Sequence, residues 1–320
     1  MLPAIALVIF GFFLLLKGAD FLINGASALA KRLHVPDLVI GLTVVAFGTS
    51  TAELFVNIFA SIEAKPSIVF GNILGSNIFN VFLILGFSAV FNPLEVNKGT
   101  VWKEIPFTLV AAVVFLVLAN DTIIGGFGPD VLSRFDGIVL LLFFLAFMFY
   151  TNAIARDFQK LNVRTTEHRY GALVTGGLIV LGLGALIFGS KLVVDGATQL
   201  ALLFGVSESL IALTIVSAGT SLPELSTSVI AAMKKNTDIA VGNIIGSNIF
   251  NIFLVLGVSA AIRPQHYDTA FNFDALVGVL SVTLTFIFMF TWRKRVFDRI
   301  EGAIFVVLYM IYVGILIHRG

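Results

Sequence analysis

The chain contains no cysteine, and only 12% of its 320 residues are charged. The missing cysteine excludes disulfide bonds and every metal site that depends on thiolate ligands. Soluble globular domains carry about 25% charged residues, so this charged fraction is unusually low. The basic residues form no patch with interleaved aromatic residues, and the net charge of +1 gives no reason to expect a nucleic-acid partner.

Hydrophobic residues make up 58% of the chain, and its mean hydropathy is +1.02. Apolar runs of about 18 to 30 residues recur along the whole length, as a helix that crosses a bilayer requires. The first of these runs continues past Lys17 and has no cleavage-site pattern, so we interpret it as a retained membrane span. The composition therefore predicts an all-α polytopic membrane protein.

The chain contains a long internal repeat. A shift of 171 residues places 18–96 on 189–267 without a gap, and 33 of the 79 aligned positions are identical. The shift superposes Glu53 on Glu224 and Asn80 on Asn251. Because the matched positions include polar residues inside apolar runs, both copies are expected to build the same kind of site.

The apolar runs predict ten transmembrane helices, five in each copy of the repeat. They lie at about 2–31, 38–62, 68–91, 102–119, 134–152, 170–203, 208–233, 239–261, 273–292 and 299–318. Since five is an odd number, the second copy must enter the membrane from the opposite face. We therefore predict two inverted five-helix repeats, with broken second and third helices in each repeat.

This interpretation divides the chain into a first repeat at 1–152, a connecting cytoplasmic loop at 153–169 and a second repeat at 170–320. The candidate cation-binding motifs fall at 43–57 and 71–80, and again at 214–228 and 242–251. Inverted repeats of this kind are typical of transporters that work by alternating access, with the site at the repeat interface.

Lysines and arginines test the orientation. If the N-terminus lies outside, the predicted inner loops contain 14 of the 20 basic residues, including the runs at 31–32, 234–235 and 293–295. By the positive-inside rule, both termini are expected on the outer side of the cell (inner) membrane.

Glu53 and Glu224 lie in the middle of apolar runs. A carboxylate at the centre of a membrane helix costs about 2.5–3.5 kcal/mol on insertion scales. No lysine or arginine occurs in the same runs. A bound cation or a proton is therefore the expected compensation.

Neutral oxygen ligands accompany both glutamates. The sequences GTSTAE and GTSLPE weaken the helical hydrogen-bond ladder just before each glutamate, and Pro223 adds a break in the second copy. In the next span, Ser76 and Asn80 share a helix face, as do Ser247 and Asn251. Carbonyl, hydroxyl, amide and carboxylate oxygens are the ligands of hard cations such as Ca²⁺.

The segments TVVAFGTSTAEL and GNILGSNIFN, with TIVSAGTSLPEL and GNIIGSNIFN, resemble the sodium/calcium exchangers of the cation/Ca²⁺ exchanger superfamily. The resemblance is strongest to compact prokaryotic members that lack a large cytoplasmic loop. It implies a group of cation sites centred on Glu53, Glu224, Asn80 and Asn251. It also implies oxygen ligands from Thr49, Ser50, Thr220, Ser221, Ser76 and Ser247, and from the backbone carbonyls of Ala46 and Ser217.

Two positions depart from the pattern of that family. Ala52 stands where the second copy has Pro223, so the first break must depend on Gly48 and Ser50. Both inner corners of the implied site are asparagines, whereas some family members have an aspartate at one corner. The two glutamates alone would then set the charge of the site.

The leading functional hypothesis is a secondary active antiporter that exchanges Na⁺ for Ca²⁺ by alternating access. It would be no enzyme, use no cofactor, and act as a monomer in the lipid bilayer with Ca²⁺ and Na⁺ as its partners. The alternative is a Ca²⁺/H⁺ or other cation/H⁺ antiporter in which Glu53 and Glu224 carry protons, and a K⁺ requirement stays open. A passive cation channel is a remote alternative. No histidine lies in the interior of a predicted span, since His318 is the last residue of the final one, and this argues against an intramembrane hydrolase.

Overall fold

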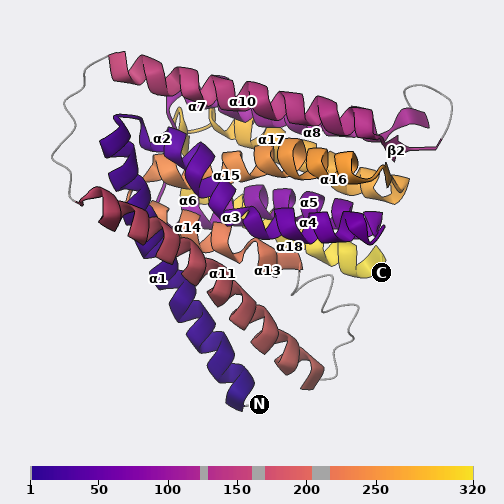
Figure 1. Cartoon of the computed structure of the whole chain (residues 1–320), viewed down its shortest axis with the longest axis horizontal. Helices are drawn as coiled ribbons and strands as arrows, with labels where there is room; N and C mark the ends of the chain where they lie inside the picture. Colours follow the sequence, from indigo (N-terminus) through magenta and orange to yellow (C-terminus); the bar gives the residue numbers. More distant parts are fainter. Residues whose placement is uncertain (1, 123–128, 161–169, 204–216, 320) are drawn as a thin grey trace.

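The computed structural model describes residues 2–122, 129–160, 170–203 and 217–319. Its regular elements are helices and four two-residue strands, joined by short turns (Figure 1). Eight of the described helices are long and apolar enough to cross a membrane, and a bent helix pair makes a ninth. The chain is a multi-pass membrane protein. The remaining predicted span, 208–233, begins within 204–216, which lie outside the described residues.

The first half of the chain begins with one long helix, continues with two spans that are each made of several helical pieces, and ends with two further spans. Its elements are α1 (Leu2–Leu33), α2 (Asp37–Ile40), η1 (Gly41–Val45), α3 (Ala46–Thr49), α4 (Thr51–Ile62), α5 (Pro66–Ile78), η2 (Phe79–Leu85), α6 (Gly86–Phe91), β1 (Leu94–Glu95), α7 (Lys98–Trp102), α8 (Glu104–Ala119), β2 (Val131–Leu132) and α10 (Arg134–Lys160).

The second half follows the same order. Its elements are α11 (Ala172–Leu203), α13 (Ser217–Thr220), α14 (Leu222–Met233), α15 (Thr237–Ile249), η4 (Phe250–Leu256), α16 (Gly257–Ile262), β3 (Gln265–His266), η5 (Thr269–Phe271), α17 (Asn272–Phe288), β4 (Val296–Phe297) and α18 (Arg299–Arg319).

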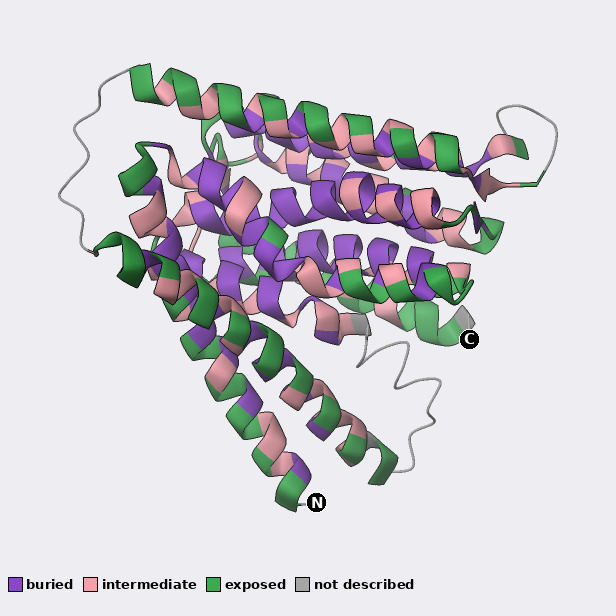
Figure 2. Ribbon diagram, in the orientation of Figure 1, coloured by how far each residue is buried: buried purple, intermediate pink, exposed green. Residues whose placement is uncertain are grey.

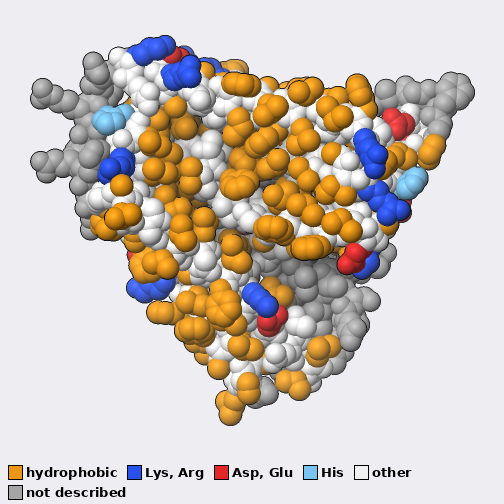
Figure 3. Space-filling model, viewed as in Figure 1, with side chains coloured by type: hydrophobic (Ala, Val, Ile, Leu, Met, Phe, Trp, Pro, Cys, Tyr) orange, Lys and Arg blue, Asp and Glu red, His pale blue; other side chains and the backbone are white. Residues whose placement is uncertain are grey.

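Two spans form the centre of the molecule. In an apolar stretch of 18 residues within each span, 78% of the residues are buried in Pro66–Phe91 and 94% in Thr237–Ile262. In the other uninterrupted spans this share is at most 33%. Burial is concentrated on these central helices, and the outer helices expose one side (Figure 2). Hydrophobic side chains dominate the exposed face in Figure 3, as a lipid-facing surface requires.

The predicted break in the second span is confirmed in the first half. The helix axis bends by 46° between Asp37–Thr49 and Thr51–Ile62, with Ser50 at the bend. In the second half Ser221 separates α13 from α14, with nearly the same backbone angles as Ser50. The first break therefore forms without proline.

The predicted break in the third span of each half is wrong. Pro66–Phe91 and Thr237–Ile262 are continuous helices that switch to π-helical hydrogen bonding at η2 and η4. These spans are buried on almost every side, so a backbone carbonyl released by a break would find no partner. A π-helical turn changes the register of the helix while keeping its backbone groups bonded.

The predicted connecting loop, 153–169, is also shorter than expected. Helix α10 continues to Lys160, and α11 begins at Ala172. Residues 161–169 lie outside the described part of the chain. The polar side chains near the end of α10 are compatible with a helix that extends beyond the apolar run.

Helices α1 and α11 pack along each other and slant away from the other helices (Figure 1). Glycines at the contact bring the two backbones together. A Cβ added to Gly18 would lie 2.9 Å from the Gly182 carbonyl oxygen, and one added to Gly189 would lie 2.9 Å from that of Gly11. The two first spans therefore form a tight helix pair.

Each half places its last helix against the central span of the other half. Helix α18 packs on α6 and η2, and α10 packs on α16 and η4. The short strands also pair between the halves: β1 of the first half pairs with β4 of the second, and β2 pairs with β3. The two halves are thus interleaved, and their central spans meet.

Candidate cation site

Glu53 and Glu224 lie beside the two helix breaks, and each is only 1% exposed. Each carboxylate accepts a hydrogen bond from a serine of the other half. Ser50 Oγ donates to Glu224 Oε1 at 3.0 Å, and Ser221 Oγ donates to Glu53 Oε1 at 3.3 Å. The second oxygen of each carboxylate is buried without a hydrogen-bond partner. The breaks therefore bring the two glutamates to one place from opposite halves of the chain.

Asn80 and Asn251 lie at the start of the π-helical turns, and both are 1% exposed. Asn80 Nδ2 donates to Asn248 Oδ1 at 2.9 Å, and Asn251 Nδ2 donates to Asn77 Oδ1 at 3.0 Å. The side-chain oxygen of each is buried and has no partner. Both amides therefore have their donor end bonded and their acceptor end free.

The two buried carboxyl groups of this region have no basic partner in the described structure. Within the described residues, neither glutamate forms a salt bridge, and no group of three or more His, Cys, Asp and Glu side chains could hold a metal. A buried polar atom without a partner costs roughly 1–3 kcal/mol, and more when it is charged. Two carboxylate and two amide oxygens in that condition could serve as ligands of a hard cation, because carboxylate, amide and hydroxyl oxygens are the ligands such ions take.

The other predicted hydroxyl ligands lie around these four residues. Thr49 Oγ1 donates to Asn243 Oδ1 at 3.1 Å, and Thr220 Oγ1 lies 3.4 Å from Asn72 Oδ1. Ser221 Oγ also lies 3.0 Å from Ser76 Oγ and can accept its hydrogen, because the single Ser221 hydrogen goes to Glu53. The equivalent Ser247 Oγ is buried without a partner. Five of the six predicted hydroxyl residues, all but Ser247, thus form hydrogen bonds between the two halves of the chain.

Two backbone carbonyls were also predicted as ligands. The Ala46 carbonyl accepts from the Ser50 amide at 2.9 Å, and Thr49 Oγ1 lies 3.3 Å from it. The last turn of α3 thus stays bonded up to the bend. Ser217 begins α13, but its side chain and the preceding residues lie outside the described part of the structure.

Asn77 and Asn248 are not among the predicted ligands. In the structure they bind the two site asparagines across the interface, and they also bond to each other's backbone carbonyl at 3.4 Å. The sequence did contain a signal for these two residues, because both copies of SNIFN have an asparagine three residues before the site asparagine. It could not reveal that each asparagine contacts the other half.

Comparisons with known proteins agree with this geometry. A family model described as "Sodium/calcium exchanger protein" matches residues 3–152 and 174–318. The chain is 39% identical to inner membrane protein YrbG of Escherichia coli, over 92% of this chain and 90% of YrbG. It is 33% identical to sodium/calcium exchanger MaX1 of Methanosarcina acetivorans, over 98% of each.

A solved structure of the sodium-calcium exchanger NCX_Mj, soaked with Na⁺ and Sr²⁺, is also similar. The TM-score is 0.83 at 31% identity, and the match covers 98% of both chains. The family model and these full-length similarities lead to one conclusion. The chain belongs to the sodium/calcium exchanger protein family.

Proposed function

We propose that this protein is a secondary active antiporter that exchanges Na⁺ for Ca²⁺ by alternating access. The observation that carries the proposal is the set of four buried oxygens without partners, Glu53 Oε2, Glu224 Oε2, Asn80 Oδ1 and Asn251 Oδ1. Two oxygens come from each half of the chain, and in the described part of the chain neither carboxylate has a basic partner. A bound cation would supply the missing partner of these oxygens, and a second kind of cation could replace it during exchange.

In this proposal the four residues are the central ligands. The outer ligands are Thr49, Ser50, Thr220, Ser221, Ser76 and Ser247, together with the backbone carbonyls of Ala46 and Ser217. The site carries a charge of −2 when both glutamates are ionised. One Ca²⁺ neutralises that charge, whereas three Na⁺ leave +1, so a three-for-one exchange would move net charge. Such a cycle responds to voltage by about 2.3 kcal/mol per charge per 100 mV.

The architecture in this proposal is ten spans in two inverted repeats. The crossed strand pairs, β1 with β4 and β2 with β3, support it, as does the equal placement of Ser50 and Ser221 at the breaks. The basic inner loops favour both termini on the outer side. The YrbG similarity supports the inner membrane. We further propose a monomer without a cofactor.

The choice of ions is supported by relatives that are themselves named sodium/calcium exchangers, MaX1 and NCX_Mj. An intramembrane carboxylate can also carry a proton, so the alternative is Ca²⁺/H⁺ exchange through Glu53 and Glu224. A passive channel is a more remote alternative, because broken helices at an interface between repeats favour alternating access.

The test is Ca²⁺ uptake by vesicles that contain the purified protein. We expect uptake when the vesicles are loaded with Na⁺ and diluted into Na⁺-free buffer, and none when Na⁺ is equal on both sides. Uptake driven by an imposed pH gradient, with no response to Na⁺, would replace this proposal with proton exchange. Rapid Ca²⁺ flux that needs no counter-ion would show a channel.

A further inference from the structure

We infer that Asn77 and Asn248 are positioning residues that decide which end of the Asn80 and Asn251 amides faces the proposed cation site. This inference rests on the proposed function and extends it. A side-chain amide has an acceptor end and a donor end of similar size. Only the oxygen end can bind a cation, so the orientation of both amides matters for binding.

The orientation of Asn248 follows from a group that can only accept. Asn248 Nδ2 donates to the Asn77 backbone carbonyl at 3.4 Å. Because a carbonyl oxygen has no hydrogen to give, the nitrogen end of Asn248 must face it. The Asn248 Oδ1 atom is then left to accept from Asn80 Nδ2 at 2.9 Å.

The orientation of the Asn248 amide then determines the orientation of the Asn80 amide. Since Asn80 must present its nitrogen to Asn248, its Oδ1 atom is turned the other way. That oxygen is the one found buried without a partner. The mirrored chain starts at the Asn248 carbonyl, passes through Asn77, and leaves Asn251 Oδ1 free. Two backbone carbonyls thus fix the polarity of both site amides.

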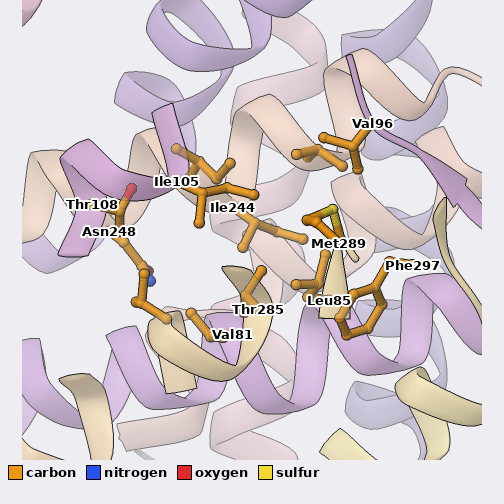
Figure 4. Close-up of a pocket in the computed structure, with 13 residues that line it drawn as sticks. Val81, Leu85, Val96, Ile105, Thr108, Ile244, Asn248, Thr285, Met289 and Phe297 are labelled. Carbon is orange, nitrogen blue, oxygen red and sulfur yellow. The ribbon is translucent and has the colours of Figure 1, made fainter. Parts of the chain in front are cut away.

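An apolar cavity beside Asn248 is a poor site for a water molecule that would compete with this network. The cavity beside Asn248, about 30 Å³, is lined mainly by apolar side chains such as Val81, Ile105 and Ile244 (Figure 4). Its polar lining hydroxyls are already bonded, Thr108 to the Glu104 carbonyl and Thr285 to the Ser281 carbonyl. A cavity of this kind offers water too few polar partners.

The test is Ca²⁺ binding to the purified full-length protein in detergent, measured by calorimetric titration. Asn248→Leu removes the acceptor and lets the Asn80 amide turn its nitrogen towards the ion. We expect Ca²⁺ affinity to fall by about tenfold, the equivalent of a lost buried hydrogen bond. If the leucine variant does not fold, Asn248→Ala makes the same test without added bulk.

A second background separates positioning from simple packing. Asn80→Asp has a carboxylate with two equivalent oxygens, so it has no nitrogen end to misdirect. Adding Asn248→Leu to it should change affinity by no more than about twofold. An equal loss in both backgrounds would make Asn248 a packing residue and overturn the inference.

The crossed pairing supplies a matched control. Asn77→Leu should couple to Asn251→Asp, whereas Asn77→Leu with Asn80→Asp, and Asn248→Leu with Asn251→Asp, should be additive. Coupling in the uncrossed pairs would contradict the inference. If Glu53→Gln and Glu224→Gln also leave Ca²⁺ binding unchanged, the proposed site itself fails, which is a different result.

An independent observation concerns an ion pair on α1. Asp20 forms a 2.5 Å salt bridge with Lys234, which follows α14. Lys234 Nζ also donates to Asn24 Oδ1 at 3.1 Å. The repeat shift of 171 places Asp20 on Lys191 and Lys234 on Glu63. The second half thus contains the same potential pair with its charges exchanged.

Only the first of these two pairs is closed. Glu63 is paired with its neighbour Lys65 at 2.5 Å, and among the described residues Lys191 forms no salt bridge. Helix α1 packs along α14, whereas the equivalent helices α11 and α4 are not in comparable contact. The structure is therefore asymmetric at two positions that the sequence repeat makes equivalent.

We infer that the two ion pairs alternate, so that Lys191 pairs with Glu63 when Asp20 and Lys234 separate. In the proposed transport cycle, the tight α1–α11 pair would move between these two contacts. Each ion pair would stabilise one of the two access states. This inference also rests on the proposed alternating access.

Cross-linking tests it directly, because the chain has no native cysteine. The variants are Asp20→Cys with Lys234→Cys, and Glu63→Cys with Lys191→Cys, in the full-length protein in membranes. We expect both pairs to form disulfides, seen on gels, and each disulfide to stop exchange. Closing one pair should prevent closure of the other when all four cysteines are present. No cross-link between 63 and 191 under any Na⁺ or Ca²⁺ condition would overturn the inference, whether or not transport is observed.

Discussion

The Ser50 hydroxyl donates a 3.0 Å hydrogen bond to the Glu224 carboxylate, although the two residues are 174 positions apart. Ser221 donates in the same way to Glu53. Each serine lies at the helix break of its own half. Each glutamate lies in the first turn of the helix after the break of its half, and it accepts from the serine of the other half. The carboxylates are therefore oriented by the opposite half of the chain.

This relationship predicts unequal effects of removing the two hydroxyls. Ser221→Ala loses bonds to both Glu53 and Ser76, whereas Ser50→Ala loses one bond to Glu224. Hydrogen bonds to charged groups are worth about 1.5–3 kcal/mol, so we expect Ca²⁺ affinity to fall about tenfold or more in Ser221→Ala and less in Ser50→Ala. The measurement is the Ca²⁺ concentration for half-maximal vesicle uptake. Thr51→Val is the control, because its hydroxyl donates to the Phe47 carbonyl of α3 and to neither glutamate.

Removing the charge of either glutamate should abolish ion-dependent stabilisation. We expect Glu53→Gln and Glu224→Gln to lose Ca²⁺ uptake, since a neutral amide is a weaker ligand for a divalent cation. A ligand that binds only the folded state raises its stability, so Ca²⁺ should raise the melting temperature of the unmodified protein but not of either variant. A normal Ca²⁺-dependent shift in both variants would refute the assignment of Glu53 and Glu224 as ligands.

The contact between α1 and α11 should tolerate no side chain at its glycines. A Cβ on Gly189 would approach the Gly11 carbonyl oxygen to 2.9 Å, whereas Gly184 on the same helix has no atom within 4 Å of that position. We expect Gly189→Val to destabilise the protein by about 1–3 kcal/mol through overpacking. Gly184→Val should have little effect. Thermal unfolding in detergent measures both, and equal melting temperatures would contradict the close contact.

A buried carboxylate outside the site makes a stability prediction. Glu104 on α8 is 1% exposed and accepts a hydrogen bond from the Tyr150 hydroxyl of α10, while its Oε2 atom has no partner. Tyr150→Phe would leave both carboxylate oxygens without a side-chain donor. We expect a loss of about 1–3 kcal/mol in thermal unfolding. Ca²⁺ affinity should stay unchanged, because the proposed ligands lie on other helices; a change in affinity without a change in stability would link this pair to the site.

Much of the protein could be predicted from its sequence. Membrane burial imposes a length and an apolar composition on each span, so hydropathy alone locates the spans near their observed helices. The repeat identified Glu53 with Glu224 and Asn80 with Asn251, because a duplicated site keeps its polar residues inside apolar runs. The cost of an uncompensated carboxylate in a membrane then singled out the glutamates.

Only the tertiary structure decided how those residues are used. A periodic pattern shows which residues share a helix face, but not that Ser50 reaches Glu224 or that Asn248 reaches Asn80 in the other half. Glycine, serine and asparagine are compatible with both a broken and a continuous helix, so the sequence predicted a break in the third spans, where the structure instead has continuous, deeply buried helices with a π-helical segment. The closed pair of Asp20 with Lys234, and the open pair of Lys191 with Glu63, follow from the arrangement of the helices, because equal sequence positions can occupy unequal contacts in one conformation.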